Sequence, residues 1–515
     1  MTIKDAKVQI KDAVTIYLKQ DNFENFIIPI ERQRPVFLMG PPGIGKTAIM
    51  EQIAGELGVG LLAYSMTHHT RQSALGLPLI VKKSYGGKEY DVSEYTMSEI
   101  IASIYDLMEE TQVKQGILFL DEMNCVSETL APAMLQFLQY KTFGRHQIPD
   151  GWIVVAAGNP PEYNKSVREF DIVTWDRIKR IDIEPDFNVW KEFAYEQGVH
   201  PAVMTYLEIK KTSFYLIETT VNGKEFVTAR GWMDLSDIIK MYEGDSLPVD
   251  SHLVKQYLQK PDIARSFALY YDLFQKYRAD YQVNDILVGK AGNEIKTRAK
   301  EARFDERIAL LGILMDSITA IIREHLESDA SLTKLLKILT ELKQPLVGKD
   351  VMEAANIISK KASDLRNDVS AGQRSSGISQ DERRLIALTA AQLDIILGKL
   401  SDSNHKEKKV LAPMPFDICK NYYNQQRKKN KTEATDTQKK LANLFAFCEE
   451  VFHESSELTI LVTEMTVNSI TAKFISTYGC EAYFRLNKEL LLFERNREII
   501  QDIELLEQEL ELKST

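Results

Sequence analysis

Residues 36–47 read VFLMGPPGIGKT. The first four form an unbroken apolar run, which is typical of a strand buried on both faces of a parallel sheet. The last eight fit the pattern G-x-x-x-x-G-K-[ST], in which small residues let backbone N–H groups close around phosphate oxygens at the start of a helix. The helix-forming sequence AIMEQIAGEL follows directly. The stretch therefore predicts a strand, a phosphate-binding loop and a helix.

The loop predicts how a nucleotide and its metal ion are held. Lys46 is expected to reach the β and γ phosphates, and Thr47 to place its hydroxyl on Mg²⁺. The loop alone does not distinguish ATP from GTP. The predicted nucleotide-binding residues are Gly40, Pro41, Pro42, Gly43, Ile44, Gly45, Lys46, Thr47 and Ala48.

Length and composition limit the class of protein. With 515 residues, 44% of them hydrophobic, the chain can bury more than one core. Its formal charge of −10 gives no electrostatic footprint for a dedicated nucleic-acid binder. The four cysteines lack C-x-x-C spacing, so we predict neither a zinc site nor disulfides, and a cytoplasmic location fits best. No apolar run approaches the roughly 18 residues of a membrane span, so we expect a soluble protein.

Short apolar segments alternate with helical ones before residue 185. The expected strands are 36–39, 60–64, 117–120, 152–157 and 179–183. Helices are expected between them, notably at 96–110 and 127–140. This alternation predicts a parallel sheet covered on both faces, with ligands at the carboxyl ends of the strands. Residues 68–92 contain glycines and prolines and are expected to form an inserted hairpin.

The predicted fold class is α/β, with a P-loop nucleotide domain, a helical lid and a long all-α C-terminal region. The boundaries follow from changes in periodicity and composition. The predicted segments are an N-terminal helix (1–30), a nucleotide-binding core (31–185), a helical lid (186–246), a helical domain (247–365), a linker (366–384) and a C-terminal helical region (385–515), whose last helix is expected at 481–512.

Polar residues follow two of the expected strands. Asp121 and Glu122 end the third strand, so both carboxylates should arrive beside the phosphate loop. Asp121 is expected to hold the Mg²⁺ site through its waters, and Glu122 to orient and polarise the attacking water. Asn159 ends the fourth strand and can hydrogen-bond that water and the γ-phosphate.

Three arginines are candidates for stabilising the transferred phosphate. Arg177 and Arg180 lie just before and within the fifth strand, and Arg230 begins a lid helix. A solvated side chain or a salt bridge is the alternative for each. Arg180 is the substitute candidate if Arg177 proves to be a structural partner of Asp176.

Taken together, these motifs resemble the AAA+ ATPases and, within them, the MoxR family. GPPGIGKT is similar to the family's Walker A motif, LFLDEMN to its Walker B motif and AAGNPPEYNKS to its sensor 1. WDRI resembles the arginine-finger element, with Ile178 where Phe is usual, and TARGWMDLS resembles sensor 2, with Ala229 where Pro is frequent. The GLP element at 76–78 is similar to the helix-2 insert of this clade, and TFGRHQIP to the hairpin before sensor 1.

The resemblance implies ATP hydrolysis in a homo-oligomeric ring, commonly a hexamer, that remodels a protein client. It also implies a partner with a von Willebrand factor A domain. The catalytic residues that it implies are Glu122, Asn159, Arg177 and Arg230. With the strand order usual in AAA+ proteins, it also implies that Arg177 points out of its own subunit and serves a neighbour's ATP.

Two other hypotheses remain. A nucleic-acid-associated NTPase or restriction-type motor would need basic loops, for which Lys82, Lys83 and Lys88 are the only hint. A non-catalytic scaffold that merely binds nucleotide is disfavoured because a P-loop lysine and an Asp-Glu pair occur together. We disfavour a nucleic-acid partner because the chain is acidic overall.

Overall fold

The computed structural model describes residues 1–68, 72, 74, 76–143, 145–163, 167, 170–220, 223–375, 380–405, 414–453 and 455–489. Contacts divide the chain into two units. The first unit comprises Met1–Val189, Thr228–Arg230 and Thr340–Ile418. The second comprises Trp190–Val227, Gly231–Leu339 and Cys419–Thr515.

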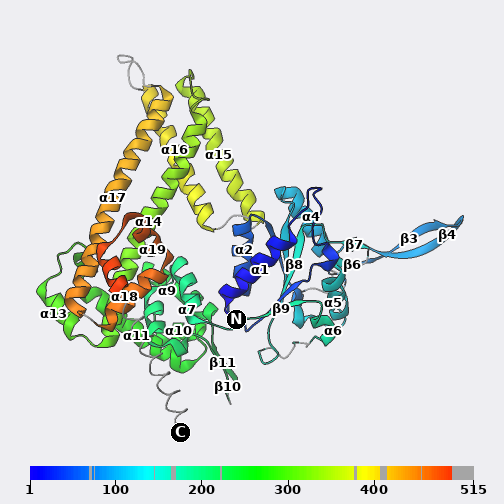
Figure 1. Cartoon of the computed structure of the whole chain (residues 1–515), viewed down its shortest axis with the longest axis horizontal. Helices are drawn as coiled ribbons and strands as arrows, with labels where there is room; N and C mark the ends of the chain where they lie inside the picture. Colours follow the sequence, from blue (N-terminus) through cyan, green and yellow to red (C-terminus); the bar gives the residue numbers. More distant parts are fainter. Residues whose placement is uncertain are drawn as a thin grey trace, which may run out of the picture. The chain divides into compact units, whose positions relative to one another are not determined.

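A five-stranded parallel sheet forms the centre of the first unit (Figure 1). Its strands are β1 (Val36–Met39), β2 (Gly60–Ser65), β5 (Gly116–Asp121), β8 (Trp152–Gly158) and β9 (Lys179–Asp182). The spatial order is β2-β5-β8-β1-β9. The predicted parallel sheet is therefore confirmed, and the fifth strand lies beside the P-loop strand, on the side away from the third.

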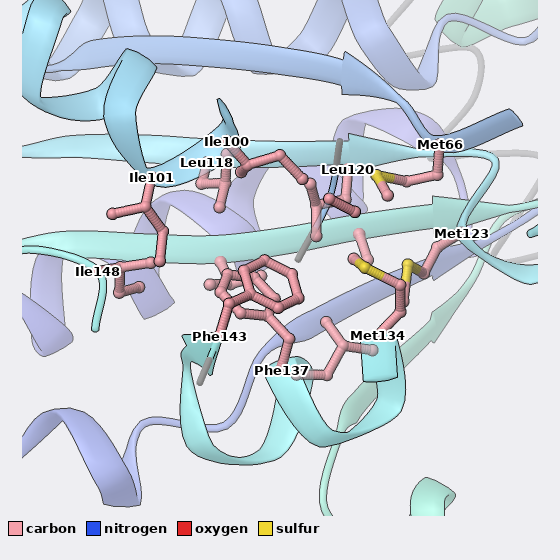
Figure 2. Close-up of a cluster of buried hydrophobic side chains, with 14 of the residues drawn as sticks. Met66, Ile100, Ile101, Leu118, Leu120, Met123, Met134, Phe137, Phe143 and Ile148 are labelled. Carbon is pink, nitrogen blue, oxygen red and sulfur yellow. The ribbon is translucent and has the colours of Figure 1, made fainter. Parts of the chain in front are cut away.

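Successive side chains of a strand point to opposite faces of the sheet, and in these strands both sets are apolar. Both faces are therefore covered by helices. Leu118 and Leu120 of β5 join a cluster that includes residues of α4 (Glu99–Thr111) and α5 (Ala131–Tyr140). Figure 2 shows this cluster, in which the rings of Phe137 and Phe143 stack with centroids 4.1 Å apart. The intervening residues of β5 join another cluster with α1 (Ile3–Tyr17) and α2 (Lys46–Leu57).

The expected inserted hairpin is present as β3 (Pro78–Tyr85) and β4 (Lys88–Tyr95). Both strands are exposed along most of their length, and the hairpin extends away from the sheet of its own unit (Figure 1). Gly86 and Gly87 turn the chain with φ angles of 59° and 80°, which glycine adopts without strain. A smaller hairpin, β6 (Thr142–Phe143) with β7 (His146–Gln147), precedes β8.

A distant part of the sequence packs on the nucleotide core. Helix α15 (Val351–Ser375) pairs with α16 (Gln380–His405), and α15 also contacts α4 and the edge strand β2. Its buried residues include Ala354, Ile358 and Ala362, which share one helical face. Helix therefore covers residues 366–375 and 380–384, where serine and glycine content predicted a linker.

The second unit is mainly helical, as expected for the lid and C-terminal region. The helices that contribute to it are α7 (Phe187–Glu196), α8 (Pro201–Ile209), α9 (Ala229–Gly244), α10 (Ser251–Tyr257), α11 (Pro261–Asp280), α12 (Val283–Leu287), α13 (Asn293–Glu301), α14 (Phe304–Leu342), α17 (Pro415–Phe452), α18 (Ser456–Val467) and α19 (Ser469–Tyr478). Residues 481–489 are helical, and the rest of the helix expected at 481–512 lies outside the described residues.

The lid segment contains a hairpin that the sequence analysis did not predict. Strand β10 (Leu216–Thr220) pairs antiparallel with β11 (Gly223–Val227). Its sequence, LIETTVNGKEFV, combines β-branched residues with an Asn-Gly pair, which is a hairpin signal. Within the described part of the chain, no helix is both long and apolar enough to cross a membrane.

Candidate nucleotide site

The loop between β1 and α2 has the backbone conformation of a phosphate-binding loop. Gly43 and Gly45 adopt φ angles of 74° and 95°, and Gly45 is the N-cap of α2. A Cβ at Gly43 would also lie 3.0 Å from the side chain of Thr228. These positions therefore favour glycine, and the loop leads into the N-terminus of α2, where backbone N–H groups attract anions.

Lys46 lies at the base of this loop and is 8% exposed. Its Nζ donates to the carbonyl oxygens of Gly40 (2.7 Å) and Pro41 (3.0 Å) and to Oδ1 of Asn159 (2.8 Å). Burial lowers the pKa of Lys46 to about 8, although the nearby carboxylate of Asp121 opposes the shift. The lysine is thus partly desolvated and held by three oxygens.

Thr47 and Asp121 meet at the end of β5. The hydroxyl of Thr47 donates to Oδ2 of Asp121 over 2.9 Å. Among the described residues, no group of three or more His, Cys, Asp or Glu could hold a metal ion. A hydroxyl and one carboxylate still suit Mg²⁺, which takes oxygen ligands and completes its shell with phosphate oxygens and water.

Glu122 directs its carboxylate toward the end of the neighbouring strand β2. Its Oε2 accepts hydrogen bonds from Oγ of Ser65 (3.1 Å) and Oγ1 of Thr67 (3.0 Å). Glu122 also has a φ angle of 54°, which is uncommon outside glycine and marks a constrained backbone. Sequence reasoning missed both hydroxyls, because their relevance depends on β2 lying beside β5.

Asn159 follows β8 and is joined to Asn124, a third residue to which sequence reasoning gave no role in the site. Nδ2 of Asn124 donates to the carbonyl oxygen of Asn159 (2.8 Å), and the N–H of Asn159 donates to Oδ1 of Asn124 (3.3 Å). Asn124 is 1% exposed. The side chains of Lys46 and Asn159 are therefore connected to the segment that follows β5.

Arg177 is exposed and lies away from the loop residues just described. Its Nη1 donates to Oε1 of Gln139, and both side chains line a groove of about 220 Å³ next to α5. Within the described chain it makes no ion pair, with Asp176 or with another residue. Two apolar side chains of the short helix α6 (Ile172–Trp175), which ends just before Arg177, are also exposed: Ile172 is 86% and Val173 is 58% exposed.

Arg180 and Arg230 have different surroundings. Nη2 of Arg180 pairs with Asp182 over 2.8 Å, and its guanidinium lies 4.7 Å from the ring centroid of Trp175. Arg180 also lines a cavity of about 600 Å³ that reaches Gly40. The backbone N–H of Arg230 donates to the carbonyl oxygen of Gly43 over 3.2 Å, which brings this residue to the phosphate loop.

Comparison with known families gives one match within the nucleotide core. Residues 35–178 match the AAA domain of the dynein-related subfamily. This region contains the phosphate loop, the Asp-Glu pair, Asn159 and Arg177, and it ends before Arg230. The match supports an AAA+ ATPase that binds nucleotide. A comparison with curated proteins gives no match.

Proposed function

We propose that the chain is an ATP-hydrolysing AAA+ ring ATPase of the MoxR type that remodels a protein client. The observation that carries this proposal is the convergence of a lysine, a hydroxyl–carboxylate pair and an amide at the carboxyl ends of three adjacent strands. The residues concerned are Lys46, Thr47, Asp121 and Asn159. Parallel α/β sheets bind ligands at this edge.

Lys46 binds the β and γ phosphates in this proposal. Its ammonium group exchanges the carbonyl oxygens of Gly40 and Pro41 for phosphate oxygens, so the loop positions the cation before ATP arrives. A buried ammonium stabilises developing negative charge more strongly than an exposed one, because less water screens it. Asn159, already in contact with Lys46, orients the attacking water and the γ-phosphate.

Thr47 and Asp121 hold Mg²⁺, which supplies charge neutralisation on the β and γ phosphate oxygens when bound. Glu122 orients and polarises the attacking water. The hydroxyls of Ser65 and Thr67 both donate to Oε2 of Glu122 and hold its carboxylate toward the end of β2, and in this proposal the carboxylate turns away from them to engage the water. The site thus contains a restraint on its own base.

Arg177 completes the site of a neighbouring subunit in a homo-oligomeric ring, which we propose to be a hexamer. Its exposure, and a hydrogen bond that goes to Gln139 of α5 and not to the phosphate loop, support action in trans rather than in cis. The exposed Ile172 and Val173 beside it offer apolar area to the neighbour. Arg230 stabilises the γ-phosphate from its position at the loop.

The remaining elements serve client and partner contacts. We propose that the exposed β3–β4 hairpin contacts the client, and that the helical unit mediates oligomer or partner contacts. A partner with a von Willebrand factor A domain is proposed from the MoxR resemblance, and a cytoplasmic location from the four cysteines without C-x-x-C spacing. The rival nucleic-acid motor has less support, because Lys83 in the hairpin is paired with Glu94.

The test is steady-state ATP hydrolysis by the purified chain with Mg²⁺. Glu122→Gln should bind ATP yet hydrolyse it at least about a hundredfold more slowly, because the amide cannot polarise water. Lys46→Ala should lose most nucleotide affinity. Chelating Mg²⁺ should abolish turnover in the wild type. Turnover at the wild-type rate in both variants, with contaminating ATPase excluded, would show that this site is not catalytic.

A further inference from the structure

Asn124 is a buried polar side chain that the roles assigned above do not use. It lies in the 3₁₀ turn Met123–Cys125, directly after the Asp-Glu pair of β5. Its amide makes two hydrogen bonds to the backbone of a single residue, Asn159, and its Oδ1 also accepts a long hydrogen bond from Sγ of the adjacent Cys125 (3.9 Å). A buried amide with this arrangement fixes a peptide group rather than a neighbouring side chain.

The geometry explains why an amide occupies this position. The register of β8 with β1 ends at Gly158, and its register with β5 ends at Ala156. The N–H and carbonyl groups of Asn159 therefore lie just beyond both ladders. The Asn124 side chain donates to the carbonyl oxygen of Asn159 and accepts from its N–H, as the backbone of a paired strand would. An amide side chain suits this role because it carries an N–H donor and a carbonyl acceptor on the same carbon.

Close packing leaves little freedom in this contact. A Cβ at Gly158 would lie 2.4 Å from Oδ1 of Asn124, so glycine lets the amide approach the strand. The position of the Asn159 backbone determines where its side chain lies, and Oδ1 of this side chain accepts a hydrogen bond from Lys46 over 2.8 Å. A shift of the Asn159 peptide would thus move the group that faces the phosphate site.

We propose that Asn124 is a positioning residue for nucleotide hydrolysis, which acts by holding the backbone of Asn159 so that its amide faces Lys46 and the γ-phosphate. This inference rests on the proposed ATPase. It separates Asn124 from the catalytic residues, since Asn124 touches neither phosphate nor water in this account. Its effect should therefore pass through Asn159.

A double-mutant cycle tests this coupling. Asn124→Ala should lower kcat about tenfold to a hundredfold, because the peptide loses both hydrogen bonds, while ATP affinity changes less than about threefold. In an Asn159→Ala background, the same substitution should lower kcat less than about threefold, because the side chain that Asn124 positions is already gone. If Asn124 contributed only to folding, Asn124→Ala would lower kcat by the same factor in both backgrounds.

Asn443→Ala is the matched control for the lost hydrogen bond. Asn443 is also an amide that donates to a backbone carbonyl, that of Leu287 over 2.9 Å, but it lies in the second unit. This variant should change thermal unfolding without changing kcat beyond about twofold.

Two glycine substitutions provide an independent perturbation. Gly158→Ala should displace the Asn124 amide without deleting it and should lower kcat to a similar extent as Asn124→Ala. Gly116→Ala is the control, because Gly116 begins β5, at the end of the strand away from the site, and its Cβ would lie 2.6 Å from the ring of Trp152. It should lower the unfolding midpoint and leave kcat near the wild-type value. Gly158→Ala also supplies the test if Asn124→Ala does not fold.

The possible outcomes distinguish a failure of the positioning role of Asn124 from a failure of the proposed ATPase activity. Equal losses of kcat from Asn124→Ala in both backgrounds would overturn the inference, because Asn124 would then act independently of Asn159. Unchanged kcat in folded Asn124→Ala or Gly158→Ala would overturn it as well. Absence of turnover in the wild type would instead overturn the ATPase proposal, and the inference with it.

Discussion

Lys46 gives the site a pH dependence that can be measured. Burial lowers its pKa from the ordinary 10.5 to about 8, and only the protonated amine can pair with phosphate. As pH rises through about 8, the free protein loses this charge, so nucleotide affinity should fall, approaching about tenfold per pH unit at higher pH. Lys46→Arg should bind more weakly but keep its affinity between pH 7 and 9.5, because a guanidinium stays charged. Identical pH profiles for the two proteins would contradict this explanation.

The same shift affects stability with the opposite sign. Between pH 8 and 10.5 the unfolded chain binds a proton at Lys46 that the folded chain has released. The contribution of this group to the free energy of unfolding should therefore rise with pH in that window. Bound nucleotide should reduce this effect, since phosphate oxygens favour the ammonium form.

Thr67 should restrain hydrolysis when no client is present. Thr67→Val keeps the size of the side chain but removes one donor to Glu122, so basal hydrolysis should rise about threefold to tenfold. Thr111→Val is a control, because its hydroxyl donates within helix α4, to the carbonyl oxygen of Leu107. A lower rate in Thr67→Val would mean that the hydroxyl positions Glu122 for catalysis instead of restraining it.

At this scale the sequence predicted most of the residues that meet in the site. Lys46 and Thr47 were predictable because a contiguous motif carries them. Asp121, Glu122 and Asn159 were predictable because each ends an apolar strand. Three further polar residues required the strand order, since they act across neighbouring strands; they are Ser65, Thr67 and Asn124.

At the scale of elements, the local sequence pattern was enough to predict the parallel sheet and the β3–β4 hairpin, but not the β10–β11 hairpin or the full length of α15. Fully apolar strands and glycine turns are encoded within a few residues, and these elements were predicted correctly. The β10–β11 hairpin was missed although its sequence contains an Asn-Gly hairpin signal, because its strands are short and half exposed and the whole segment was assigned to a helical lid. The helix over 366–375 was missed because its stability comes from pairing with α16 rather than from its own sequence.

The β3–β4 hairpin should be dispensable for nucleotide binding and required for client contact. A variant in which a short glycine linker replaces residues 79–94 removes mainly exposed side chains. We expect nucleotide affinity and the unfolding midpoint to change little, and client retention by the ATP-bound Glu122→Gln protein to be lost. Lys83→Ala with the hairpin intact is the control, since it breaks only the ion pair with Glu94. Full client retention without the hairpin would contradict the prediction.

The whole molecule joins a nucleotide core to a large helical unit through several chain crossings. The chain leaves the first unit after Val189, returns to it for Thr228–Arg230 and again for Thr340–Ile418, and then leaves it once more. No local pattern could predict that α15, some 250 residues after α4, would pack on it. The predicted domain boundaries remain predictions. Sequence periodicity does not show that the chain leaves a unit and later packs on it again.

Assembly should control activity if Arg177 acts in trans. An arginine finger contributes about 10³ to 10⁵ in rate, far more than an exposed salt bridge contributes to stability. Specific activity should therefore rise with protein concentration as rings form. Ile172→Asp should weaken assembly and shift this rise to higher concentration, because a charge replaces an exposed apolar side chain beside Arg177.

The most direct test mixes Arg177→Ala with Glu122→Gln subunits. Each variant alone should bind ATP and hydrolyse it poorly. In mixed rings, some interfaces pair an intact Glu122 with an intact Arg177 from the neighbour, so the account predicts that hydrolysis partly returns. Size and composition of the mixed assemblies should be measured alongside the rate. No return of hydrolysis in rings that contain both subunit types would contradict a shared site.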